Sequence, residues 1–468
     1  MEARRCWKMS FEMDGAAQER LRQYFDLMGD VLVEPRRRVS YAMYAMGLFG
    51  DGERKSMEPI AAKACGSAED IDAHHQRLGH FITDSKWSDR AVRRTGARYA
   101  IDEMIKPGPI EAWIIDDTGF LKQGKHSVGV KRQYTGSAGK ITNCQIGVSL
   151  SISTRTEHLP IDFELYLPKE WAEDPDRRKE ARIPEHVQFA TKPELALKML
   201  DHALEDKVPK GVVLADEGYG NNGPFRAGVR ARGLHYAVAI NSSTTLWVVD
   251  REGGRGLVKW TPKEIAKALG KKRFRRTTWR EGTSQRLSAK FAARRVVVGH
   301  DDGQPPGERE EQWLLMEWRD GEDEPAHFYL VTLAKETSRK LMVRLVKERY
   351  RTERAYEDLK NELGLDHFEG RRFSGWHHHV SVALNCYAFV VAEKCRAFSP
   401  SEGWKGKAGP LQPEAGAPLR GLLHHVPLGD RAHPEHLAPS VSSLPPNPNP
   451  GDLSVFPCFT QAPLGLTQ

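Results

Sequence analysis

The sequence predicts an α/β protein in which a core of strands and helices follows a purely helical segment. Alternating apolar residues indicate strands between residues 113 and 240, and a capping box indicates a helix among them. Residues 16 to 104 show helical periodicity instead. With 468 residues, the chain is long enough for two or three domains with sizeable cores.

The core elements are expected in the order strand, strand, strand, helix, strand, helix, strand. In chain order they are strands at 113–116, 144–153 and 161–167, a helix at 191–204, a strand at 212–216, a helix at 225–232 and a strand at 235–240. Thr191 and Glu194 form the capping box of the first helix, and Gly233 ends the second. A basic loop is expected after the first strand.

Composition changes divide the chain further. The predicted parts are a helical segment at 1–105 that is a candidate DNA-binding domain, a core at 106–398 with a β-rich insertion at about 241–326, and a tail at 399–468. Strands are expected in the insertion at 246–249, 295–298 and 313–317. Of the 28 prolines, 13 lie between Pro400 and Pro463, where few apolar residues recur with a period. Such a tail cannot bury enough surface to fold alone, so we expect it to be disordered.

Three acidic residues stand out, each in a different local pattern. Asp116 and Asp216 end hydrophobic strands, and Glu353 lies in a long charged helix. Carboxylates bind hard divalent cations, and two such cations about 4 Å apart can activate water and stabilise the leaving oxygen of a phosphodiester. Taken singly, each acid could equally be a turn or cap residue.

Each of the three has an acidic neighbour as a rival. Asp117 and Glu217 adjoin the strand-end acids, but side chains alternate along a strand, so only one of each pair should face the metals. Glu357 is four residues from Glu353 and shares its helix face. A charged helix of this kind also forms ordinary salt-bridged surface, so the helix alone leaves the choice between Glu353 and Glu357 open.

These motifs resemble the DDE insertion-sequence transposases, which are DDE superfamily endonucleases, and in particular the bacterial group with a Y-R-E-K glutamate signature. The resemblance covers about residues 40 to 385. It rests on Asp116 with Thr118, on Asp216 with Gly218 and Tyr219, on Arg349, Glu353 and Lys360 at the spacing of the signature, and on the stretches 124–130 and 362–371. Val346 stands where the signature has its tyrosine, which puts the role of that aromatic residue in doubt, although Tyr350 is near.

The resemblance implies a ribonuclease H-like catalytic domain in which the first and fourth strands are adjacent and parallel. It implies that Asp116, Asp216 and Glu353 bind two Mg²⁺ ions, for which Mn²⁺ can substitute. Lys360 would neutralise phosphate charge, and Arg349 would pair with a DNA phosphate or orient Glu353. The implied enzyme cuts double-stranded DNA at the terminal inverted repeats of its element and joins the 3′ hydroxyl to target DNA, as a homodimer.

Two other functions stay open. A host-adopted DNA-binding protein could keep this fold without catalysis, and a stand-alone nuclease or an interaction protein would never join strands. A net charge of +7 and a pI near 8.9 favour polyanionic partners without requiring them.

Two groups of basic residues are candidates for contact with DNA. They are Lys122, Lys125, Lys131 and Arg132 after the first strand, and Arg273, Arg275, Arg276 and Trp279 in the insertion. Cations interleaved with aromatic residues can hold a phosphate backbone and stack on an unpaired base. The alternative is solvated surface.

The remaining features predict no further chemistry. Residues 377–379 are three histidines without metal-site spacing, expected at a helix start or facing DNA. The apolar run at 380–392 is too short to cross a bilayer and predicts a buried core helix. The six cysteines show no framework spacing, and residues 1–15 do not resemble a signal peptide, so we expect a cytoplasmic protein that works at the bacterial nucleoid.

Overall fold

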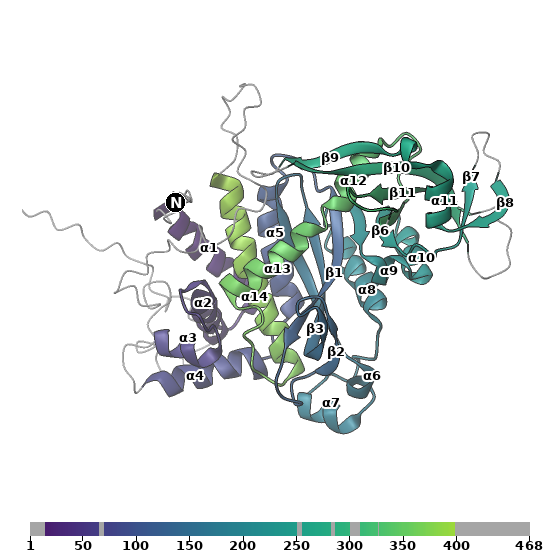
Figure 1. Ribbon diagram of the computed structural model, residues 1–468. Helices are drawn as coiled ribbons and strands as arrows, with labels where there is room; N and C mark the ends of the chain where they lie inside the picture. Colours follow the sequence, from purple (N-terminus) through teal and green to yellow (C-terminus); the bar gives the residue numbers. More distant parts are fainter. Residues whose placement is uncertain are drawn as a thin grey trace, which may run out of the picture.

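The computed structural model describes residues 15–64, 70–249, 255–281, 286–299, 309–325 and 327–397. The tail predicted at 399–468 lies outside these ranges. A large sheet forms the centre of the molecule, with helices around one half of it and a smaller β-rich region at the other end (Figure 1).

The core half of the sheet has the strand order β2-β3-β1-β5-β6, and β4 also pairs with β3. The strands are β1 (Ala112–Leu121), β2 (Lys131–Thr135), β3 (Lys140–Ser153), β4 (His158–Tyr166), β5 (Val212–Ala215) and β6 (Tyr236–Ile240). Strand β1 is antiparallel to β3 and parallel to β5, and β5 is parallel to β6. The adjacency of the first and fourth predicted strands is therefore confirmed, and the mixed sheet fits a ribonuclease H-like fold.

Two expectations about the start of the core are wrong. Strand β1 does not end at Asp116 but continues to Leu121, because β3 is long enough to pair with it as far as Cys144. The segment after β1 is not all loop, since Lys131 and Arg132 belong to β2, which pairs with the same long strand. Asp116 thus lies within a continuous strand and not at its end.

The insertion extends the sheet in the order β6-β12-β11-β10-β7-β8, with β9 paired to β10. Its elements are β7 (Leu246–Val249), β8 (Arg255–Trp260), α11 (Pro262–Leu269), β9 (Arg275–Glu281), β10 (Arg286–Val298) and β11 (Gln312–Trp318), followed by β12 (His327–Val331). The three strands predicted here are confirmed, two of them as parts of longer strands. Strands β8 and β9 and helix α11 were not predicted.

Helices cover the core half of the sheet. They are α6 (Lys169–Ala172), α7 (Pro175–Ala181), α8 (Lys192–Glu205), α9 (Glu217–Gly220), α10 (Gly223–Ala231), α12 (Arg339–Lys347), α13 (Tyr350–Leu363) and α14 (Phe373–Ala397). The predicted capping box of α8 is present, with Thr191 and Glu194 each bonded to the other's backbone. Helix α8 packs on β3 and β4, and α13 packs on β1 and β4. Residues at the N-terminal ends of α8, α9 and α13 line one cleft together with residues of β1 and of the end of β5.

The described part of the chain between residues 15 and 104 is helical. Its elements are α1 (Gly15–Leu32), α2 (Pro35–Phe49), α3 (Met57–Ala64), α4 (Ile71–Gly79), η2 (His80–Asp84) and α5 (Asp89–Met104). These helices lie around α14 (Figure 1) and share one hydrophobic cluster with it that continues into the core. Tyr24 donates a 2.9 Å hydrogen bond to the Asn385 carbonyl. The boundaries near residues 105 and 398 stay a prediction, because this packing does not by itself separate a domain.

The apolar run at 380–392 lies within α14 and is buried, so the predicted core helix is confirmed. Residues 377–379 lie near the start of α14, which begins at Phe373, so the helix-start alternative is confirmed; all three side chains are buried, so the DNA-facing alternative is wrong. His378 bonds to the carbonyls of Ile82 and Trp87, and His379 bonds to the Tyr44 hydroxyl. Among the described helices, none is long and apolar enough to cross a membrane.

Candidate active site

Asp116, Asp216 and Glu353 line one cleft of about 910 Å³, hereafter the acidic cleft. They come from β1, from the end of β5 and from α13. Arg349 and Lys360 line the same cleft. The structure thus brings together all five residues that the sequence predicts for catalysis.

Asp116 is nearly buried, with 7% of its surface exposed. Its Oδ1 accepts a 2.9 Å hydrogen bond from the Asp117 amide, and its Oδ2 accepts one of 2.9 Å from Arg349 Nη1. Burial raises the pKa of Asp116 to about 7, and the charge of Asp216 adds to the increase while that of Arg349 opposes it. This carboxylate is therefore costly to ionise without a cation beside it.

Asp216 follows β5 directly and caps the N-terminus of α9. Its Oδ1 accepts hydrogen bonds of 2.9 Å from the Gly218 amide and 3.4 Å from the Tyr219 amide. Parallel pairing of Ile114 with Leu214 places the chain after β5 beside Asp116. Because one oxygen is held by α9, the other is the oxygen available to a ligand in the cleft.

Glu353 lies in the first turn of α13, with 65% of its side chain exposed. Arg349, at the start of the same helix, reaches both acids, since its Nη2 is 3.6 Å from Glu353 Oε1 while its Nη1 bonds to Asp116. Burial opposes the charge of Arg349, but Asp116, Asp216 and Glu353 together raise its pKa. The guanidinium lies between two of the candidate metal ligands.

The acidic rivals differ in their surroundings. Asp117 lines the cleft too, but its Oδ2 accepts bonds from Lys192 Nζ at 3.0 Å and from the Tyr219 hydroxyl at 3.3 Å. Glu357 also lines the cleft and forms a 3.1 Å salt bridge with Arg354, whereas Glu217 does not line it. The choice of Asp116, Asp216 and Glu353 as the metal ligands stays a prediction.

Lys360 is tied to the sheet below the cleft. Its Nζ donates to Thr118 Oγ1 at 2.9 Å and to the Gly119 carbonyl at 2.7 Å, and burial lowers its pKa. Thr118, two residues after Asp116, therefore positions the lysine of the glutamate signature.

The sequence interpretation missed two residues of the cleft. Tyr356 bonds through its hydroxyl to Ser149 Oγ at 2.5 Å, and Ser149 is the strand partner of Asp116. Lys192 binds Asp117, as described above. Tyr356 could have been found, because a residue three positions after Glu353 lies on the same helix face. Val346, at the tyrosine position of the signature, is buried on α12 instead.

The basic residues near β2 differ in burial and in the contacts that their side chains already make. Lys122 donates from Nζ to the Phe368 carbonyl at 2.5 Å, and burial lowers its pKa to about 8. Lys131 pairs with Glu170, while Lys125 and Arg132 are exposed. Their contact with DNA stays a prediction.

The basic residues of the insertion lie on or beside β9. Arg273 and Arg275 are exposed, and Arg276 pairs with Asp320 at 2.9 Å. Trp279 is half-buried, and Lys347 Nζ lies 4.7 Å from the centre of its ring. Stacking of Trp279 on a base would have to compete with this lysine.

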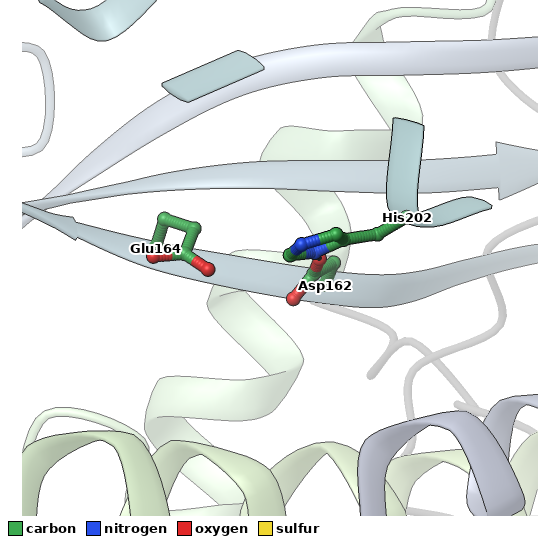
Figure 2. Close-up of side chains that lie close together, drawn as sticks. All are labelled: Asp162, Glu164 and His202. Carbon is green, nitrogen blue, oxygen red and sulfur yellow. Dashed lines mark hydrogen bonds and ion pairs between the residues drawn. The ribbon is translucent and has the colours of Figure 1, made fainter. Parts of the chain in front are cut away.

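A second group of possible metal ligands lies on β4 and α8. Asp162, Glu164 and His202 have ligand atoms within 4.8 Å of one another (Figure 2). Arg93 Nε is 2.9 Å from Asp162, and Lys198 Nζ is 3.3 Å from Glu164. Although burial opposes ionisation of Asp162, Arg93 and His202 keep its pKa below the ordinary value. The two acids of this group are thus already neutralised by the protein's own cations.

Comparison with known proteins identifies two overlapping families. Residues 26–286 match the DDE superfamily endonuclease family, and residues 190–389 match the transposase DDE domain. The chain is also 32% identical over 208 residues to a probable transposase for insertion sequence element IS701 from Microchaete diplosiphon. That match covers 44% of this chain and 50% of the relative, so the chain spans about half the length of the curated relative that it matches.

Proposed function

Because this chain belongs to the DDE superfamily endonucleases, we propose that it is a transposase, which cuts DNA at the ends of a mobile element and joins the freed 3′ hydroxyl to target DNA. The observation that carries the proposal is the convergence of Asp116, Asp216 and Glu353 on the acidic cleft, with Arg349 and Lys360 beside them. The IS701 relative supports the same activity.

The donor atoms of the cleft fit a hard divalent cation. Three carboxylates from separate elements supply oxygen ligands of the kind that Mg²⁺ and Mn²⁺ prefer. Two such ions, when bound, would activate the attacking oxygen and stabilise the departing one. Asp216 is already oriented for this by the two amides of α9, and Asp116 by its own backbone neighbour.

The chain's other residues would handle the DNA. Lys360, held by Thr118, presents a fixed positive charge at the wall of the cleft. Lys125 and Arg132 on one side and Arg273 and Arg275 on the other are exposed cations suited to duplex phosphates. We expect a homodimer at the paired terminal inverted repeats, at work on the bacterial nucleoid.

The decisive experiment incubates the purified protein and Mg²⁺ or Mn²⁺ with duplexes that contain the DNA flanking its gene, and measures nicking and strand joining. Wild-type protein should do both. Asp116→Asn, Asp216→Asn and Glu353→Gln should bind the duplex without cutting it, whereas the neighbouring Glu357→Gln should retain cleavage.

Other outcomes would favour other functions. Duplex binding without cleavage by the wild type would indicate the inactive DNA-binding protein that Val346 allows. Cleavage without joining of a supplied 3′ hydroxyl end would indicate a stand-alone nuclease.

A further inference from the structure

Arg349 occupies the space between two carboxylates that the proposed function assigns to divalent cations. Its Nη1 is 2.9 Å from Asp116 Oδ2, and its Nη2 is 3.6 Å from Glu353 Oε1. Among the described residues, it is the one cation within salt-bridge distance of either acid. The protein therefore supplies a positive charge of its own at the centre of the acidic cleft.

The fold fixes the backbone on both sides of Arg349. Before it, Lys347 forms a 2.6 Å ion pair with Glu317, which is fully buried in the insertion sheet. After it, Arg351 donates to the carbonyl of Arg155 at 2.7 Å. Because the chain is anchored within two residues in each direction, the backbone of Arg349 is held where its guanidinium reaches both acids.

The other cations of the cleft do not do the same. Lys360 is bound to Thr118 and Gly119, and Lys192 is bound to Asp117. Neither forms a salt bridge with Asp116, Asp216 or Glu353 in the described structure. Removing Arg349 would leave the three acids without a paired cation, and a divalent ion would then meet no competitor for Asp116 Oδ2.

We propose that Arg349 is a stand-in cation, which pairs Asp116 and Glu353 in the free protein and yields them only when DNA enters the cleft. The inference rests on the proposed function. A guanidinium binds phosphate oxygens in the same forked geometry as it binds carboxylates, so a DNA phosphate at the cleft can take Arg349 over. Divalent ions then bind weakly to the free protein and tightly to the protein–DNA complex. The enzyme therefore does not carry its catalytic metal ions in the absence of its substrate.

The test measures the affinity for Mn²⁺ alone, from the electron paramagnetic resonance signal of free Mn²⁺, without relying on activity. Arg349→Gln should bind Mn²⁺ roughly tenfold or more tightly than the wild type, since a charge-assisted bond no longer competes. Arg349→Lys keeps the charge and should stay near the wild type. Lys360→Gln is the matched control, which removes the same charge from the same cleft and should gain clearly less.

A second measurement adds DNA to the wild type and uses Arg349→Gln as the reference. Addition of a short duplex should tighten Mn²⁺ binding by the wild type toward that of Arg349→Gln, and should add little to Arg349→Gln itself. The same duplex without protein, and with Asp116→Asn, corrects for Mn²⁺ held by DNA.

The outcomes separate the two proposals. If Asp116→Asn weakens Mn²⁺ binding but Arg349→Gln gains no more than Lys360→Gln, the stand-in role is overturned and the metal site stands. Equal Mn²⁺ affinity of the wild type with and without duplex overturns it as well. If Asp116→Asn leaves Mn²⁺ binding unchanged in every background, the acidic cleft is not the metal site and the proposed function fails with it.

Discussion

Two regions of this protein gather acidic side chains, and they differ in how the acids are neutralised. Around Asp162, Arg93 and Lys198 supply cations at salt-bridge distance, and Arg93 is itself only 3% exposed. In the acidic cleft, Arg349 is shared between Asp116 and Glu353, while Asp216 is held by amides. A buried acid that is paired with the protein's own cation is costly to leave unpaired, whereas acids in excess of nearby cations can bind cations from solution.

The comparison predicts its largest effect for a substitution in the cleft. Asp216→Asn should lower metal-dependent cleavage by at least about a thousandfold, because several kcal/mol of transition-state stabilisation go with the lost ligand. Its midpoint of urea unfolding should stay close to that of the wild type, since the amides of α9 can still bond to the asparagine oxygen. Cleavage rates and urea titration of the same preparations check both parts, and near-normal cleavage would remove Asp216 from the site.

A substitution in the region around Asp162 should instead lower the stability of the fold. Arg93 binds Asp89 at 2.6 Å and Asp162 at 2.9 Å, so Arg93→Met removes the arginine partner of the half-buried Asp89 and of the buried Asp162. We expect the free energy of unfolding to fall by about 3 to 5 kcal/mol, the usual cost of breaking a buried pair. Urea unfolding measures this. The exposed, unrelated Arg98→Met is the control, and an equally small loss for both variants would show that the Arg93 pairs do not support the fold.

A third prediction concerns the pH dependence of stability that His379, a buried histidine of α14 outside both acidic regions, should cause. Burial lowers the pKa of His379 to about 4, from an ordinary value of 6.5. The unfolded chain takes up this proton below about pH 6.5 while the folded chain does not, so stability should fall as the pH is lowered from 6.5 toward 4. His379→Gln should be less stable at neutral pH and should lose less on acidification. His126→Gln, at an exposed side chain, should retain the pH dependence of the wild type, and unfolding at several pH values decides the matter.

Sequence reasoning succeeded where local pattern carries the information. The alternation in β3 and the capping box of α8 follow from local periodicity, whereas the approach of Asp116 to Asp216 is what the resemblance to the transposases implied. It failed where a long-range partner decides the outcome. Strand β1 continues past Asp116 because β3 pairs with it, and no local feature of residues 117–121 requires this.

The same limit applies to the polar contacts. Arg349 was expected to meet phosphate or Glu353, and its bond to Asp116 joins residues 233 positions apart. Arg93, Asp162 and His202 come from three separate elements, so nothing in the spacing predicts their network. The residue types of the cleft could thus be predicted, but not the pairing that separates an ion-binding cleft from a structural cluster.

The smallest expected effect concerns two adjacent arginines of β9 at the surface. One is paired with an acid and the other is not, as in the comparison of the two acidic regions. Arg276 is paired with Asp320, whereas Arg275 is exposed and has no salt bridge within the described ranges. A cation that contacts a DNA phosphate contributes about 0.9 to the slope of log affinity against log salt, because counterions are released when it binds. Arg275→Gln should therefore reduce the slope by about that amount. Arg276→Gln should reduce it less, because Asp320 already occupies this guanidinium. Fluorescence anisotropy of a labelled duplex across a salt series measures both slopes. Identical slopes for the wild type and both variants would mean that β9 is solvated surface, and that the DNA lies elsewhere on the protein.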